Sequence, residues 1–180
     1  RAAPGTTTAF ATAARRPHGG NPLDGPNTKS LATPAQMHER IGSDFGTSEW
    51  MLLDQAKVSA FADLTDDRYF IHTDPERAKR ETPYGGTIAH GFLTLSMLAQ
   101  MAYQVCPAVE GTKSGVNYGF NRLRCVARVP TGSRVRGRFR LKDFEIRPAE
   151  RWQATWDVSV EVEGGTKPAI AAEWLNAGFF

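Results

Sequence analysis

The chain has 180 residues, 41% of them hydrophobic and 23% charged, and its 22 basic and 19 acidic residues give a net charge of +3. This length fits one domain, or one domain with a tail, and the composition is that of a soluble globular protein. The net charge is too small to argue for nucleic-acid binding, although it suits a phosphorylated substrate, and the two cysteines, Cys106 and Cys125, lack metal-type spacing and indicate reduced intracellular thiols.

Residues 1–30 form a segment of distinct composition, rich in Ala, Thr, Gly and Pro, with no acidic residue before Asp24. Such a stretch cannot bury enough apolar surface to offset the entropy lost on ordering. We interpret it as a disordered tail or an expression remnant. A transit peptide is the alternative, because Ala, Thr and Arg without acidic residues are also typical of that class. The predicted location is therefore the cytoplasm, or an organellar matrix if the segment is a transit peptide.

Polar capping residues predict three short helices in the next part of the chain. Each expected helix follows an Asp or Thr that can cap its first turn, and two of them have proline at the first helical position. The expected helices run from Thr33-Pro34 to Gly42, from Asp54 to about Leu64, and from Asp74-Pro75 to Ala78. A short strand is expected at 49–53.

A long stretch without charge is expected to form a central helix. No Asp, Glu, Lys or Arg occurs from Thr82 to Val105, and the segment 92–104 is amphipathic. A run of this kind predicts a helix that protein surrounds on most sides. The segment is nevertheless too polar to span a bilayer.

The C-terminal half alternates between apolar and polar residues, as strands with one wet face do. The expected strands cover 117–125, 135–141, 156–163 and 169–175. Gly164-Gly165 supplies the hairpin turn before the last of them. Early helices, one buried helix and a late antiparallel meander predict a single α+β domain over 31–180, in which a sheet wraps the helix.

Asp67 and His72 are the candidate acid/base pair of the sequence. They lie five residues apart, upstream of His90-Gly91, which opens the uncharged helix. A carboxylate and an imidazole so placed are candidates for shared proton transfer. The first N–H groups and the positive dipole end of the helix are free for a ligand. The simpler alternative for Asp67 is a loop or capping residue, and Asp74 is better explained as an N-cap than as a catalyst.

These residues resemble the motif of the MaoC-like dehydratase family, and more closely its nodulation-protein-N-like branch. The family pattern is a small residue, then Gly-Asp-x-Asn-Pro-x-His, with Asp two residues later and Ile-x-His-Gly downstream. The matching residues here are Asp67, His72, Asp74 and Ile88-Ala89-His90-Gly91. The likeness covers about 45–175 and includes 74–78, 85–87, 116–121 and 129–135. The chain departs from the pattern at Asp66, where glycine is usual, and at Tyr69 and Phe70, which replace Asn-Pro.

The resemblance implies a hot-dog fold, usually paired as a homodimer, and the hydration of trans-2-enoyl-CoA to (R)-3-hydroxyacyl-CoA with the reverse dehydration. It implies that Asp67 and His72 grip one water, with Asp67 taking the proton of the water and His72 protonating Cα, or with the two roles reversed. Gly91 would hold the thioester oxygen at the helix start. The expected substrate-binding residues are Tyr69, Phe70, Tyr84, Gly86 and His90, with His90 positioning the turn. No metal and no cofactor are expected, since coenzyme A is part of the substrate.

Several alternatives stay open from the sequence. The aromatic side chains at 69, 70 and 84 either line an acyl pocket or simply pack. The arginines at 136, 138 and 140 are most simply a solvated strand face, although some of them, or Lys113, Arg122 and Arg124, can meet the phosphates of coenzyme A. The other function classes are a hot-dog thioesterase and a non-catalytic acyl-thioester binder. A thioesterase of this kind commonly has an acidic residue on the central helix, and none lies between Gly91 and Val105.

Overall fold

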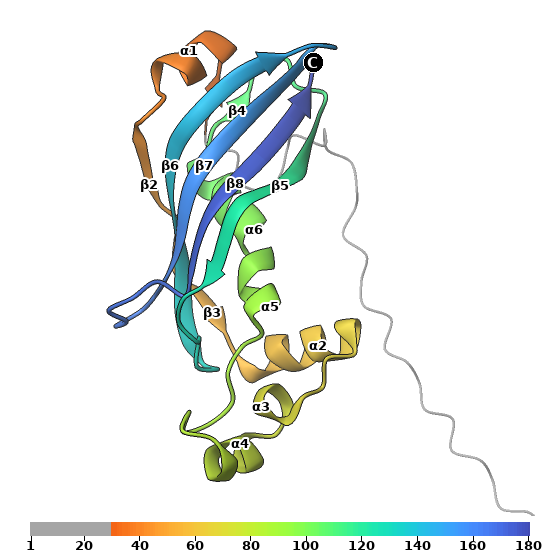
Figure 1. Cartoon of the computed structure of the whole chain (residues 1–180), viewed down its shortest axis with the longest axis vertical. Coiled ribbons are helices and arrows are strands. Elements are labelled where there is room, and N and C mark those ends of the chain that lie inside the picture. Colours follow the sequence, from red (N-terminus) through yellow and green to blue (C-terminus); the bar gives the residue numbers. More distant parts are fainter. Residues whose placement is uncertain (1–29) are drawn as a thin grey trace, which may run out of the picture.

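A strongly bent antiparallel sheet curves around a pair of consecutive helices in the computed structural model, which describes residues 30–180 (Figure 1). The main sheet has the strand order β2-β6-β7-β8-β5, and β3 pairs with β6 beside this path. Its strands are β2 (Asp44–Thr47), β3 (Met51–Leu53), β5 (Ser114–Cys125), β6 (Ser133–Arg147), β7 (Arg151–Val162) and β8 (Ile170–Phe179). A small parallel pair joins β1 (Leu31–Ala32) to β4 (Ala108–Val109). The tail expected at 1–30 lies outside the described residues, apart from Ser30.

The helices are α1 (Pro34–Glu39), α2 (Gln55–Thr65), α3 (Phe70–Thr73), α4 (Pro75–Glu81), α5 (Gly91–Ser96) and α6 (Leu98–Val105). The helices α1, α2 and α4 begin where the capping residues predicted. Thr33 forms a capping box, and the side chains of Asp54 and Asp74 each accept the backbone N–H three residues on, at 2.9 Å. Helix α4 runs three residues beyond the expected end at Ala78, and the short helix α3 was not predicted. No helix within residues 30–180 is long and apolar enough to cross a membrane.

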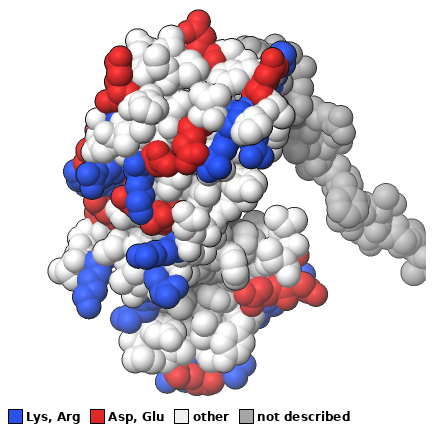
Figure 2. Space-filling view, turned by 45° about the horizontal axis from the view of Figure 1, so that its top comes forward, with Lys and Arg blue, Asp and Glu red and all other residues white. Residues whose placement is uncertain are grey.

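The long strand β6 shows why the sheet forms and where its arginines point. Val135, Phe139 and Leu141 are fully buried against the core, while the arginines between them lie on the opposite face. Those arginines engage neighbouring groups, as Arg136 Nε does with Glu161 at 2.7 Å and Arg138 Nε with Asp44 at 2.9 Å. Basic and acidic side chains are intermixed on the face shown in Figure 2. The simpler prediction, a solvated strand face, therefore describes these arginines.

Helix α6 approaches the sheet closely at Gly137. A Cβ at Gly137 would lie 2.8 Å from the Phe139 ring and 3.1 Å from Met101 Cβ in α6, so no side chain fits between. Met101 and Phe139 are both fully buried. A glycine in mid-strand commonly marks such a close approach.

The predicted central helix is present but differs from expectation in two ways. It is divided at Met97 into α5 and α6, although the bonds from Met97 N to Leu93 O and from Met101 N to Met97 O carry the chain through the junction. The prediction that protein surrounds it on most sides is wrong for this chain alone. Phe92 is 75% exposed and Tyr103 is 53% exposed. The sheet covers one side of the helices, and their uncharged outer side remains open.

Candidate active site

Two segments that are distant in sequence meet beneath the start of α5. Helix α2 ends at Asp66, and the chain turns through Asp67 into α3, which carries His72. The N–H of Ile88 donates to the carbonyl of Ile71 at 3.0 Å, so the loop before α5 lies against α3. This pairing brings the sequence-predicted Asp67 and His72 to the His90-Gly91 turn.

The two histidines form a stacked pair within this junction. Their ring centroids lie 3.7 Å apart with an angle of 25° between the planes. His72 Nδ1 is 2.7 Å from the carbonyl oxygen of Ile88, and His90 Nε2 is 3.0 Å from that of Asp67. A carbonyl only accepts hydrogen bonds, so Nδ1 of His72 carries a hydrogen and its Nε2 keeps a lone pair. Burial lowers the pKa of His72, and the neighbouring His90 lowers it further, which favours the neutral imidazole at neutral pH.

Asp67 joins the two histidines to form a cluster of three polar side chains. Its carboxylate is 55% exposed, and Oδ2 lies 4.0 Å from Nε2 of His90, whose side chain is 2% exposed. One ligand atom from each of Asp67, His72 and His90 lies within 4.8 Å of the others. A single water can bridge groups at that separation through two hydrogen bonds of ordinary length.

The same cluster is close enough to be tested as a metal site. Two imidazoles and a carboxylate are ligands that zinc and other transition metals use. Two histidines that bind one ion must point their nitrogen lone pairs toward a common point. The rings of His72 and His90 are stacked and nearly parallel, so their lone pairs lie in separate, nearly parallel planes. One ring would have to turn out of the stack before both bound an ion. The arrangement therefore suits a water better than a metal.

A cavity of about 240 Å³ opens beside the cluster at the start of α5. His72 and Gly91 lie in its wall, together with Ile88, Ala89, Thr94, Cys125, Val126, Ala127, Arg128, Val129, Ala169 and Ile170. No side chain caps the N-terminus of α5, so the first N–H groups of that helix remain available to a ligand. A Cβ at Gly91 would lie 3.1 Å from Cys125 Sγ, which shows how closely the end of β5 approaches this turn.

None of the expected substrate-binding residues lies in the wall of this cavity, although Tyr84 and His90 each contact a residue that does. Tyr69 is 59% exposed and packs edge-on against Phe70 at 4.8 Å between centroids. Tyr84 lies under the guanidinium of Arg128, a wall residue, at 5.2 Å. His90 is buried behind His72, and Gly86 is partly buried in the preceding loop.

Sequence reasoning missed most of the cavity wall. The end of β5 and the segment 126–129 contribute Cys125 and Arg128, and the start of β8 contributes Ile170. These residues reach the site through the curvature of the sheet, which leaves no signal in local spacing. The nearest available signal was the strand expected at 117–125, whose end now lies over Gly91.

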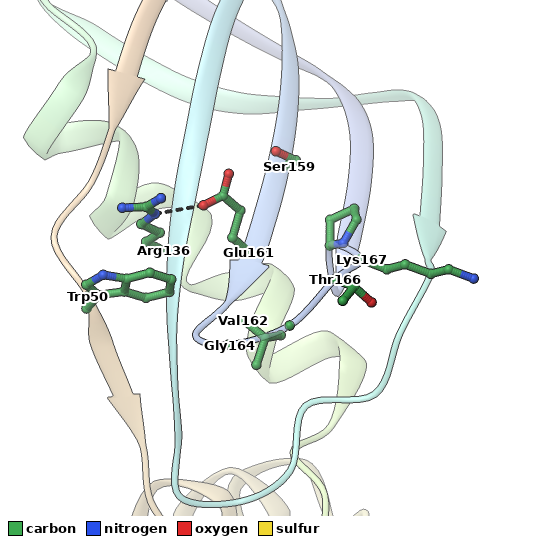
Figure 3. A pocket seen from close by; sticks show the side chains of 10 residues that line it. Trp50, Arg136, Ser159, Glu161, Val162, Gly164, Thr166 and Lys167 are labelled. Atoms are coloured by element: carbon green, nitrogen blue, oxygen red, sulfur yellow. Dashed lines mark hydrogen bonds and ion pairs between the residues drawn. The ribbon is translucent and has the colours of Figure 1, made fainter.

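A larger cavity of about 360 Å³ lies elsewhere, on the sheet face that carries the arginines (Figure 3). The side chain of Arg136 stacks on Trp50 at 4.4 Å and is paired with Glu161 at its edge. The charges of Arg136 and Glu161 in this cavity thus already neutralise each other. None of the predicted catalytic residues lines this cavity, so we place the candidate active site in the smaller one.

Comparisons with known proteins show the family of this chain and agree with its fold. Residues 36–163 match the family model of the MaoC like domain. The chain is 48% identical over 142 residues to nodulation protein N of Rhizobium leguminosarum bv. viciae, covering 79% of this chain and 88% of that protein. It is 43% identical over 145 residues to 3-hydroxyacyl-thioester dehydratase Z of Mycobacterium tuberculosis, covering 81% and 95%.

The solved structures that resemble this chain share its fold at lower identity. An R-hydratase from Pseudomonas aeruginosa superposes with a TM-score of 0.61 and 20% identity, covering 81% of this chain and 84% of that one. At this identity the likeness concerns the fold alone. It confirms the α+β hot-dog architecture, with a curved antiparallel sheet around central helices.

Proposed function

Because this chain belongs to the family of MaoC-like domains, we propose that it is a hydro-lyase acting on acyl thioesters. Its reaction is the addition of water to trans-2-enoyl-CoA, giving (R)-3-hydroxyacyl-CoA, and the reverse dehydration. The observation that carries the proposal is that His72 and Gly91 share one cavity wall, while Asp67 lies outside that wall within 4.8 Å of His72. Each of the three chemical tasks of a hydratase then has a candidate group.

The first task is to activate water, and His72 suits it. Its lowered pKa keeps the ring neutral, so the Nε2 lone pair is free to accept a proton, which supports giving His72 the role of base. In the proposed step the water oxygen bonds to Cβ while an O–H bond of the water breaks and its proton moves to Nε2. Asp67 accepts a hydrogen bond from the second hydrogen of the water and orients it. Positioned proton transfer of this kind contributes on the order of 10²–10⁴ in rate.

The second and third tasks are to hold the developing charge and to protonate Cα. The electrons of the Cα=Cβ bond move onto the thioester oxygen, which the N–H groups at Gly91 and the positive end of α5 stabilise. Collapse of this enolate then takes the proton from His72 to Cα, which restores the neutral imidazole. Gly91 leaves room for the substrate to reach the backbone.

The carrier of the acyl group is proposed to be coenzyme A, recognised by basic side chains near the cavity. Arg128 lies in the cavity wall and is exposed. Arg122 and Arg124 lie on β5, the strand that ends at the cavity, whereas the arginines of β6 are engaged on the other face of the sheet. Guanidinium groups bind phosphate oxygens strongly.

We also propose that two copies of the chain pair as a homodimer through β5. This strand is an edge of the main sheet, and most of its residues are exposed. Its exposed apolar residues include Val116, Tyr118 and Phe120. A second copy would pair with the free side of the strand and cover these side chains.

The test is the hydration of crotonyl-CoA and longer trans-2-enoyl-CoAs, followed as loss of the enoyl-thioester absorbance, with chiral analysis of the product. We expect Asp67→Asn and His72→Gln each to lower kcat by about 10²–10⁴-fold. Asp63→Asn and His38→Gln change exposed residues of the same types outside the site and should match wild type. Wild-type protein that is inert at every chain length would refute the hydratase, and full activity in both site variants would refute the site.

A further inference from the structure

The side chain of Gln55 joins the two segments that form the active site. Its Nε2 donates to the carbonyl oxygen of His72 at 2.7 Å and to Ser59 Oγ at 3.2 Å. Its Oε1 accepts from the hydroxyl of Thr87 at 2.6 Å. One amide therefore holds α3 at His72 and, at the same time, the loop that leads to Gly91.

The Gln55 amide bonds to both sides of the His72–Ile88 contact, and we call this pair of hydrogen bonds the Gln55 brace. The ring of His72 bonds to the carbonyl of Ile88, and Thr87 is the residue immediately before Ile88. Gln55 thus ties the backbone carbonyl of His72, whose ring donates, to the side-chain hydroxyl of Thr87, the neighbour of the accepting Ile88. Both held residues are buried, His72 at 9% exposed and Thr87 at 7%.

The base of this brace is rigid. Gln55 is the first residue of α2, whose start is fixed by the Asp54 cap. Three residues on, Val58 is fully buried in the core, so the first turn of the helix cannot shift freely. The partly buried amide therefore extends from a fixed point.

We propose that Gln55 is a positioning residue, which keeps Nε2 of His72 in place on the reacting water. The inference rests on the proposed function and adds to it a residue that does not touch the substrate. The role requires an amide, because the same group must donate to a carbonyl and accept from a hydroxyl. Residues that hold catalytic groups in this way matter because a displacement of about 1 Å can cost on the order of 10²-fold in rate.

The variant Gln55→Glu tests this requirement with nearly no change in shape. A carboxylate still accepts from Thr87, but it cannot donate to the carbonyl of His72 and repels that oxygen. We expect kcat for crotonyl-CoA to fall about 10- to 100-fold while KM stays within about twofold. Gln36→Glu is the matched control, since the side chain of Gln36 accepts from the N–H of Thr33 in the capping box and a carboxylate can do the same.

A second readout follows His72 itself and does not depend on activity. The Nδ1–H of His72 is bonded and buried, so its proton should give a protected ring signal in NMR spectra. We expect this signal to shift or to exchange away in Gln55→Glu and to be unchanged in Gln36→Glu. If wild type is not a hydratase, the proposed function fails, and this signal alone then decides the role of Gln55.

Two outcomes would overturn the proposal: a His72 signal unchanged in Gln55→Glu, or a kcat within twofold of wild type in an active enzyme. A rise in KM without loss of kcat counts against it equally.

If Gln55→Glu does not fold, variants of Thr87 replace it in the test. Thr87→Val removes the hydroxyl and should lower kcat and disturb the His72 signal, whereas Thr87→Ser keeps the hydroxyl and should restore both. Equal behaviour of Thr87→Val and wild type would also overturn the proposal.

Discussion

Asp66 forms the turn by which the chain leaves α2 and enters Asp67. Asp66 ends α2 with φ of 61°, in the left-handed region, at the position where the family pattern usually has glycine. A side chain in this region costs about 1–2 kcal/mol, and less for Asp than for most residues. The carboxylate is paired with Arg68, which also binds Asp63, but these groups are largely exposed to solvent. Exposed pairs of this kind contribute little to stability. The backbone strain at Asp66 is therefore not offset by its ion pair.

Replacing Asp66 with glycine should stabilise the protein. Removing the Cβ relieves backbone strain of about 1 kcal/mol, which corresponds to a rise of about 2–4 °C in Tm for a chain of this size. Thermal unfolding followed by circular dichroism measures the shift. Asp66→Ala is the control, because it removes the same carboxylate and keeps the Cβ, so it should show no gain. An equal rise in both variants would mean that charge, and not the backbone conformation, is responsible.

At the scale of elements, the sequence predicted the features that depend on contacts between residues close together in the chain. The helix starts at Thr33, Asp54 and Asp74 follow from capping groups that act within one turn, and the prediction of all three was confirmed. The short strand β2 and the division of the central helix at Met97 were not predicted, because both depend on packing against β6 and the rest of the sheet. The meeting of Cys125 with Gly91 depends on sheet curvature in the same way. The spacing of the family motif predicted which residues form the cluster, but it did not predict which residues line the cavity beside it.

The placement of β5 over α5 predicts selective labelling of one cysteine. Cys125, the last residue of β5, is exposed and lines the cavity, whereas burial of the Cys106 thiol raises its pKa and disfavours the reactive thiolate. A maleimide should modify Cys125 alone in the folded protein, as mass spectrometry would show. The adduct would occupy the cavity beside Gly91, so hydratase activity should fall at least tenfold.

Two controls separate this effect from general damage. Cys125→Ser should retain its activity after the same treatment, and crotonyl-CoA present during labelling should slow the modification of wild type. Labelling of Cys106 in folded protein would contradict the burial of its thiol. Full activity once Cys125 is modified would contradict the proposed position of the substrate.

At the scale of the whole molecule, this chain leaves apolar surface uncovered along one side. The outer side of the helices exposes Phe92 and Tyr103, and the edge strand β5 exposes Val116, Tyr118 and Phe120. A long exposed edge strand with apolar side chains invites pairing with another strand. The opposite edge differs, because β2 is only four residues long and its Asp44 is paired with Arg138. The surface therefore favours association through β5 over association through β2.

The last prediction is that disrupting β5 separates the two copies. Wild type should sediment as a dimer at micromolar concentration, and Tyr118→Lys should sediment as a monomer. The substitution removes an apolar side chain from the proposed interface and places a positive charge on the β5 strand of each copy. Ile146→Lys is the matched control, since Ile146 is 58% exposed, much as Tyr118 is 57% exposed, but lies on β6 opposite Trp152 of β7 and not on the edge strand β5. Analytical ultracentrifugation distinguishes the states. A monomeric wild type, or dissociation by Ile146→Lys and not by Tyr118→Lys, would rule out pairing through β5. Because β5 ends at the cavity, the Tyr118→Lys monomer should also bind crotonyl-CoA more weakly, which a rise in KM would reveal.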